Sequence, residues 1–169
     1  MKHLLIPVLL LSACGGDEPV HDQRHAPRDL MQENRDAVKL EDRDIDLYVR
    51  RYELELTKSG AGIRYRLLRE MPGDTIQPGQ WAKVNYRMEL LSGDTAYTSK
   101  AGEPESFLVE MDDVESGLHE GIQHLSPGDS ALIIIPSYRA HGIIGDQSKV
   151  PMRSTVVYHI GLVAIAPNE

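Results

Sequence analysis

Apolar positions recur with a helical period between about residues 30 and 56 of this chain. The positions that would share one helix face are Ile45, Tyr48, Val49, Tyr52 and Leu56. Their separations of three and four residues are typical of an amphipathic helix. Asp42 or Asp44 is a suitable N-cap, and Ser59-Gly60 is a suitable stop, so we predict a helical segment over residues 30–58.

The period changes from helical to alternating at about residue 63. Residues 63–68 nearly alternate between apolar and polar side chains, as a half-buried strand does. Turn signals rich in Pro and Gly then divide the chain into short segments. We predict strands over residues 63–68, 81–91, 97–99, 107–109, 131–135 and 155–165, and one short helix over residues 117–125.

This order of elements predicts an α+β domain over residues 60–166, in which an antiparallel sheet wraps over one short helix. A long loop over residues 136–151 would join the last two strands. Long ordered loops in compact domains are often functional, so we expect part of any site to lie there.

The first 14 residues have the layout of a secretory signal. Lys2 precedes an apolar run over residues 4–11, which is too short to span a bilayer because that takes about 20 residues. Residues 11–14, Leu-Ser-Ala-Cys, resemble the bacterial lipoprotein signal. The resemblance implies that residues 1–13 are removed and that Cys14 carries a lipid. The alternative is a plain cleaved signal peptide with an incidental cysteine.

Residues 14–29 are polar and rich in Gly, Pro, Asp and His, which is typical of a flexible tether. His21 and His25 lie in this tether, and we interpret them as solvated residues because no apolar stripe supports a helix there. The helical segment that follows either binds a partner or a second copy of the chain, or packs on the domain and spaces it from the membrane. We favour the second interpretation.

Charge and cysteine content exclude several classes of protein. The chain has 18 Lys and Arg against 26 Asp and Glu, a net charge of -8, so we predict no nucleic-acid partner. Cys14 is its only cysteine, which rules out an internal disulfide and a cysteine zinc cluster. The sequence contains no nucleophile elbow, zinc-ligand spacing or phosphate-binding glycine loop. We therefore predict neither a cofactor nor a metal.

Five short motifs, in order and at matching spacings, resemble those of the FKBP-type peptidyl-prolyl cis-trans isomerases. They are Val84–Leu90 (V-x-Y-x-x-x-L), Val114–Ile122 (V-I-x-G-(W/L)-x-x-G-(L/V)), Leu125–Asp129 (M-x-x-G-(E/D)), Ile135–Gly142 (I-P-x-x-x-A-Y-G), and Val150-Pro151 with Thr155–Tyr158 (I-P-x-x-(S/T)-x-L-x-F). The resemblance implies the FKBP-like fold. A lipoprotein signal, a helix and such a domain together also resemble lipid-anchored members from Bacteroidetes, including those associated with gliding motility.

The activity that this resemblance implies is rotation about the X–Pro amide, which has a barrier of about 18–20 kcal/mol. At the twisted midpoint the amide loses its charge separation. A pocket that excludes water and holds the flanking atoms therefore favours the midpoint over the planar ends. Such a reaction needs no nucleophile, metal or general base. We expect a shallow apolar and aromatic cavity with one or two polar groups.

The resemblance assigns nine residues to this cavity. They are Tyr86, Tyr97, Phe107, Val114, Glu115 (through its backbone N–H), Leu118, His141, Val150 and Tyr158. The alternative reading is that the aromatic and apolar members are packing residues, as they would be in any domain of this kind.

Four positions depart from the family pattern. Thr98 stands where an acidic residue is frequent, and Glu115 stands where an aliphatic side chain is usual. Leu118 replaces the tryptophan of many members, and His141 replaces a tyrosine. An imidazole can still donate a hydrogen bond, but it titrates near neutrality. We expect these changes to weaken the binding of macrocyclic inhibitors and to lower catalysis.

Together these features predict a lipid-anchored peptidyl-prolyl isomerase that assists the folding of exported proteins in the bacterial cell envelope. Its clients would be proline-containing polypeptides. It would face the periplasm or the cell surface, on the outer membrane in preference to the inner. The alternative, which the four departures favour, is a non-catalytic FKBP-like chaperone or a subunit of an envelope secretion or motility machine.

Overall fold

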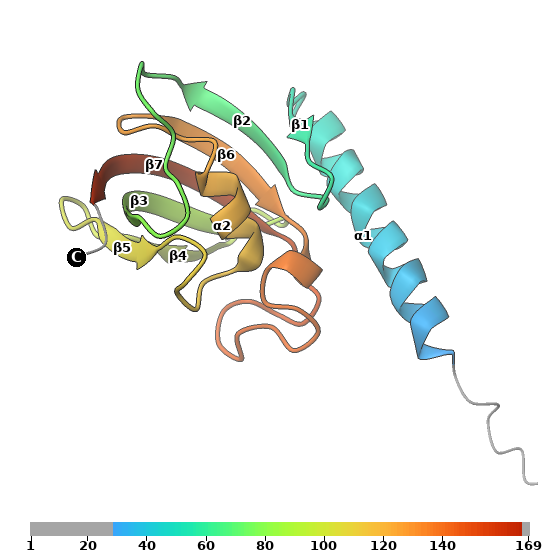
Figure 1. Cartoon of the computed structure of the whole chain (residues 1–169). Helices are drawn as coiled ribbons and strands as arrows, with labels where there is room; N and C mark the ends of the chain where they lie inside the picture. The colour runs from blue at the N-terminus through green and yellow to red at the C-terminus, as the bar shows by residue number, and fades with distance from the viewer. Residues whose placement is uncertain (1–28, 167–169) are drawn as a thin grey trace, which may run out of the picture.

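The computed structural model describes residues 29–166, which form a curved sheet over one short helix with a long helix at one end (Figure 1). The expected signal peptide over residues 1–13, the lipidation site Cys14 and the tether up to residue 28 lie outside the described residues. Within residues 29–166, no helix combines the length and the apolar character that crossing a membrane requires.

In chain order the elements are α1 (Leu30–Arg51), β1 (Thr57–Lys58), β2 (Arg64–Arg69), β3 (Trp81–Leu90), β4 (Thr95–Thr98), β5 (Glu105–Leu108), α2 (Ser116–Ile122), β6 (Ser130–Ile135), the 3-10 helix η1 (Ser137–Arg139) and β7 (Val156–Ala166). The predicted elements occur in the predicted order, and the structure adds β1 and the 3-10 helix, which were not predicted. The sheet has the strand order β1-β2-β6-β7-β3-β4, with β5 also paired to β3. Every pair is antiparallel, so the predicted fold class is confirmed.

Strand β6, apolar from Ala131 to Ile135, separates two layers of the core. Side chains alternate between the faces of a strand. Ile133 and Ile135 therefore join the main core under α2, while Leu132 and Ile134 pack on the opposite face with Ile45 of α1. This explains why β6 shows no polar alternation in the sequence: both of its faces are covered.

Helix α1 begins earlier than the predicted N-cap. Asp29 is the N-cap, and its carboxylate accepts hydrogen bonds from the backbone N–H groups of Met31 and Gln32, each at 3.2 Å. The predicted caps Asp42 and Asp44 were wrong, because both lie inside the helix. The apolar stripe begins only in the second half of α1, so the stripe alone does not show where the helix starts.

Helix α1 also ends earlier than the predicted segment over residues 30–58, at Arg51. Glu53 has a positive φ of 50°, and the N–H of Leu54 donates to the Val49 carbonyl at 2.9 Å, so the chain leaves the helix here. Leu54 and Leu56 still pack beside Ile45, but from the segment that follows the helix. The Ser59-Gly60 pair lies in the turn between β1 and β2 and does not end the helix.

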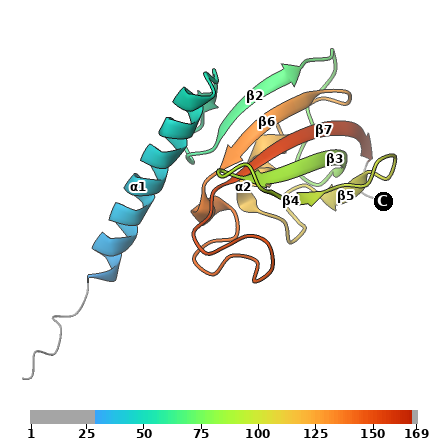
Figure 2. The ribbon, with the colours of Figure 1, turned by 180° about the vertical axis from the view of Figure 1, so that it is seen from behind.

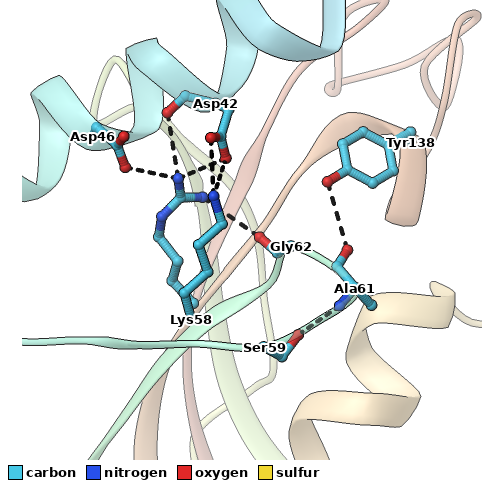
Figure 3. A network of polar contacts seen from close by, with 8 residues as sticks. Asp42, Asp46, Lys58, Ser59, Ala61, Gly62 and Tyr138 are labelled. Atoms are coloured by element: carbon cyan, nitrogen blue, oxygen red, sulfur yellow. Dashed lines mark hydrogen bonds and ion pairs between the residues drawn. The ribbon is translucent and has the colours of Figure 1, made fainter. Parts of the chain in front are cut away.

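The contacts of helix α1 with the domain include one fully buried side chain and one ionic cluster. Ile45 is fully buried. Arg64 of β2 is also buried, and its Nη2 lies 2.7 Å from a carboxylate oxygen of both Asp42 and Asp46 (Figure 3). Lys58 adds a third contact to Asp42 at 2.8 Å. The structure therefore agrees with the interpretation of α1 as a helix that packs on the domain. Seen from behind, its N-terminal half extends beyond the sheet (Figure 2).

Candidate functional site

A cavity of about 640 Å³ opens between the sheet, the start of α2 and the loop that joins β6 to β7. Eight of the nine residues assigned by resemblance line it. They are Tyr86, Tyr97, Phe107, Val114, Glu115, Leu118, His141 and Tyr158. Strands β3, β4, β5 and β7, helix α2 and the loop each contribute at least one of these residues. The site is therefore assembled by tertiary contacts across most of the domain.

Val150 is the exception among the nine residues. It is buried in the main core, with 2% of its surface exposed, and it does not line the cavity. Its backbone N–H donates to Asp146 at 2.8 Å, so it supports the loop instead. Val150 is thus the one residue of the nine that the structure does not bring to the cavity lining, because its side chain packs in the main core.

Strand alternation places the walls of the cavity. Val84, Tyr86 and Met88 are two residues apart on β3, so all three face the cavity. The rings of Tyr86 and Tyr158 lie with their centroids 5.7 Å apart. Leu118, 5% exposed, contributes to the lining from α2, where Gly117 and Gly121 let the helix lie close to β6.

Tyr86 holds its phenol against a carboxylate. Its hydroxyl donates to Glu105 Oε2 at 3.2 Å. Burial raises the pKa of the Tyr86 phenol, and the charges of Glu105 and Glu115 raise it further, to about 12. The phenol is therefore a neutral hydrogen-bond donor at any physiological pH.

Tyr97 is joined to the loop by Asp146, which accepts a hydrogen bond from the Tyr97 hydroxyl. Asp146 also accepts the N–H groups of Ser148 and Val150, each at 2.8 Å. Burial by itself would raise the pKa of Asp146. The hydrogen bonds from Tyr97, Val150 and Ser148 outweigh burial and, with the charge of His141, lower that pKa to about 2. Asp146 is therefore an ionised organiser of the loop beside the cavity.

Glu115 is the most enclosed carboxylate of the lining. It is the N-cap residue of α2, and its side chain is only 9% exposed. The Tyr158 hydroxyl donates to Glu115 Oε1 at 2.8 Å, and burial together with this carboxylate raises the pKa of Tyr158 well above its usual range. His141 Nε2 lies 2.9 Å from the same oxygen without the alignment of a hydrogen bond. The contact becomes an ion pair when the imidazole is protonated.

Thr98 does not line the cavity. Its hydroxyl donates to the Tyr86 carbonyl at 3.0 Å and thereby ties β4 to β3. Sequence reasoning also missed the acidic character of the cavity, whose lining includes Glu105 and Asp113 as well as Glu115 but no Lys or Arg. Glu105 lies two residues before Phe107 on one strand, so the alternation of β5 was a usable signal. Asp146 has no such signal because it lies in an irregular loop.

Among residues 29–166, no group of three or more His, Cys, Asp or Glu side chains is arranged to hold a metal ion. The polar groups of the cavity instead pair with one another, phenol to carboxylate. Besides these pairs, the cavity presents aromatic walls, the His141 imidazole and the Glu115 backbone at the start of α2. Such a surface can enclose a short apolar segment and hold the polar atoms next to it.

A family model described as FKBP-type peptidyl-prolyl cis-trans isomerase matches residues 73–163. A probable isomerase of this type from Haemophilus influenzae is 26% identical over 110 residues, covering 64% of this chain and 45% of that relative. A probable FkpA from Neisseria meningitidis serogroup B is 30% identical over 112 residues, covering 66% of this chain and 40% of that relative. This chain thus spans less than half the length of these two proteins.

Two solved structures are similar to most of the chain. The crystal structure of FkpA from Escherichia coli superposes with a TM-score of 0.68 at 25% identity, over 83% of this chain and 65% of that one. A peptidyl-prolyl cis-trans isomerase from Pseudomonas syringae pv. tomato superposes with a TM-score of 0.65 at 22% identity, over 78% of this chain and 95% of that one. The second likeness concerns the fold alone.

Proposed function

This chain belongs to the family of FKBP-type peptidyl-prolyl cis-trans isomerases, and from that premise we propose that its cavity catalyses the rotation of X–Pro bonds in polypeptides. The observation that carries the proposal is the convergence of eight family-assigned residues, from separate elements, on one cavity of about 640 Å³. A set of packing residues alone would not need to surround an open space.

The residues of the cavity suggest how rotation is favoured. The rings of Tyr86, Phe107 and Tyr158 would enclose the proline ring over Leu118 and remove water from the amide. An amide with reduced charge separation loses less on leaving water than a planar one, so the twisted form gains relative stability. The backbone N–H of Glu115 and the His141 imidazole would supply the hydrogen bonds that hold the chain on either side of the bond.

A peptide assay tests this proposal. The chain without residues 1–14 should accelerate isomerisation of a short X–Pro peptide in proportion to its concentration. Tyr86→Ala should reduce the acceleration at least tenfold while the circular dichroism spectrum stays unchanged. Tyr52→Ala is the matched control, because Tyr52 is 53% exposed and lies outside the cavity. No acceleration at micromolar protein would refute the proposed activity.

We further propose that a lipid on Cys14 anchors the chain in the cell envelope, on the outer membrane and facing the periplasm or the surface, where it assists the folding of exported proteins. The support is the sequence of residues 1–14 alone. Cys14→Ser should move the protein from the membrane fraction to the soluble fraction and abolish incorporation of labelled palmitate. Equal membrane recovery of the wild-type and Cys14→Ser proteins would count against lipidation.

A second candidate function, a chaperone that binds clients without catalysis, is favoured by the surface of the β6–β7 loop. Ile143, Ile144 and Met152 are 59%, 65% and 69% exposed there. Exposed apolar side chains of this kind suit capture of unfolded chains. This function predicts that the protein suppresses aggregation of a proline-free unfolded protein, and that Tyr86→Ala leaves the suppression unchanged. Loss of suppression in Tyr86→Ala would tie client capture to the isomerase cavity.

A further inference from the structure

The loop between β6 and β7 presents His141 to the cavity and holds Asp146 beside it. Its two ends are Ser137, just after β6, and Thr155, just before β7. A loop of this length keeps a defined shape only if its ends and its interior are tied down. The ties at its two ends come from a residue outside the segment that matches the family model.

Glu41 of α1 binds both ends of this loop. Its Oε1 accepts hydrogen bonds from the backbone N–H of Ser137 and from the Thr155 hydroxyl, each at 2.6 Å. Its Oε2 accepts a hydrogen bond from the Ser137 hydroxyl at 2.8 Å. Ser137 and Thr155 are buried, at 6% and 4% exposure, and Glu41 is the acceptor that the structure gives these donors. Hydrogen bonds to a charged acceptor are about twice as strong as neutral ones.

Further hydrogen bonds connect Ser137 to the residues on either side of His141 in the cavity. The Ser137 carbonyl accepts the N–H of Ala140 at 3.0 Å and the N–H of Gly142 at 2.7 Å. These two residues flank His141, whose Nε2 lies 2.9 Å from Glu115. The position of the imidazole is therefore coupled to Glu41 through one residue, Ser137.

Helix α1 is itself held in place against the sheet. Ile45, one turn after Glu41, is fully buried, and Asp42 pairs with the buried Arg64 at 2.7 Å. Figure 3 shows this ionic cluster beside Tyr138, a residue of the same loop whose hydroxyl donates to the Ala61 carbonyl. The helix thus forms a rigid support on which Glu41 can hold the loop.

We propose that Glu41 is a positioning residue of the isomerase, and that α1 completes the active site instead of serving only as a spacer. Glu41 does not line the cavity and acts through Ser137, Thr155 and the loop they bound. This inference rests on the proposed isomerase function. It also implies that residues 73–163, which match the family model, do not contain everything that the site requires.

Variants at Glu41 test the proposal. Glu41→Ala should lower kcat/KM for an X–Pro peptide about tenfold, because small displacements of positioning groups have large effects on rate. Glu41→Gln keeps a side chain of the same length with one acceptor oxygen, so it should recover most of the rate. Glu41→Asp is one methylene too short to reach both loop ends and should not. Glu55→Gln, an exposed change after the helix, is the matched control.

Thr155→Val and Ser137→Ala each remove one hydroxyl donor and keep the test valid if Glu41→Ala fails to fold. Each should lower kcat/KM by a smaller factor than Glu41→Ala. All assays should be run well below the melting temperature of every variant, so that unfolding does not lower the measured rate. An unchanged kcat/KM in a folded Glu41→Ala variant would overturn the inference. If Glu41→Ala does not fold, an unchanged kcat/KM in both Thr155→Val and Ser137→Ala would overturn it.

Two measurements separate this inference from the proposed function. Amide hydrogen exchange at Ala140 and Gly142, and the NMR signals of the His141 imidazole, report the loop directly. In Glu41→Ala we expect faster exchange at both amides and a shifted His141 signal, even if the wild-type protein isomerises nothing. An inactive wild type would refute the isomerase proposal, whereas unchanged exchange and an unchanged imidazole signal would refute the role of Glu41.

Discussion

Glu115 and Tyr158 form a buried pair at the cavity, with the Tyr158 hydroxyl donating to Glu115 Oε1 at 2.8 Å. The phenol hydroxyls of Tyr86 and Tyr97 are likewise engaged by carboxylates, Glu105 and Asp146. A peptide that enters the cavity thus meets aromatic walls whose hydroxyls already have acceptors. It also meets negative charge, since the lining includes three carboxylates and no Lys or Arg, and the nearby Lys149 lies over the Tyr97 ring at 4.8 Å.

This charge predicts a preference among clients. A peptide with Lys before proline should be isomerised with a higher kcat/KM than the same peptide with Glu there, by about fivefold, which corresponds to about 1 kcal/mol for a solvent-accessible charge interaction. The ratio should fall as salt is raised, because salt screens exposed charges. Glu105→Gln should reduce the ratio, and the exposed variant Glu103→Gln should not. Equal rates for the two peptides at low salt would contradict this prediction.

The lowered pKa of Asp146 predicts an acid-dependent contribution to stability. In the unfolded chain an aspartate titrates at about 3.9, whereas in the folded protein Asp146 titrates at about 2. The stabilisation by ionised Asp146 is therefore complete above the unfolded pKa and is lost as the pH falls through the folded one. We expect the melting-temperature difference between wild type and Asp146→Asn to be constant from pH 7 to about 5. Between about pH 4 and 2 it should shrink.

The measurement for Asp146 is thermal unfolding followed by circular dichroism at each pH. The exposed variant Glu55→Gln serves as the reference for effects of net charge alone. A melting-temperature difference that stays constant down to pH 2 would show that Asp146 does not organise the loop as an ionised group.

The ion pairs between Arg64 of β2 and two carboxylates of α1 should contribute to the stability of the protein. The Arg64 side chain is 4% exposed, while its partners Asp42 and Asp46 are 37% and 53% exposed. The hydrogen bond from Lys58 and the charge of Arg64 lower the pKa of Asp42 although burial opposes them. Because the carboxylates are partly solvated, we expect Arg64→Met to lower the free energy of unfolding by about 1–3 kcal/mol, less than for a fully buried pair.

A double-mutant cycle with Asp42→Asn gives the coupling free energy between Arg64 and Asp42. The free energy of unfolding of each variant is measured by urea unfolding. The coupling energy should be favourable. Lys39→Met is the control, since Lys39 is exposed and pairs with Asp36 at 3.5 Å within the helix. A coupling energy of zero would show that the Arg64–Asp42 pair does not stabilise the fold, and would leave the effect of Arg64→Met to its other contacts, including Asp46.

The absence of a side chain at Gly117 lets α2 lie close to the sheet. A Cβ at this position would lie 2.3 Å from the Ile135 side chain, so either α2 or β6 must shift. Gly117→Ala should therefore destabilise the fold by about 1–3 kcal/mol and lower isomerase activity through displacement of Leu118. Gly60→Ala, where a Cβ meets no atom within 4 Å, should have an effect near zero. The test is urea unfolding together with the peptide assay, and equal stability of the two variants would refute the close-packing argument.

Much of the fold follows from local patterns in the sequence. Strand β3 was predicted at 81–91 and runs from Trp81 to Leu90, because alternation and the turn signals on either side are local properties. The same holds for α2 and β7. The two-residue strand β1 was not predicted, because Thr57 and Lys58 have no period of their own and are extended only by pairing with β2.

The sequence by itself determined the order of the longer strands and of the helices, the family and most of the residues that reach the cavity, since these depend on local periodicity and short motifs. Only the tertiary structure decided the end of α1, the inward turn of Val150 and the phenol–carboxylate pairs. Only the structure shows that Glu41 contacts Ser137 and Thr155, which lie 96 and 114 positions away along the chain. No local period encodes such contacts, because they exist only when the sheet, α1 and the loop are packed together.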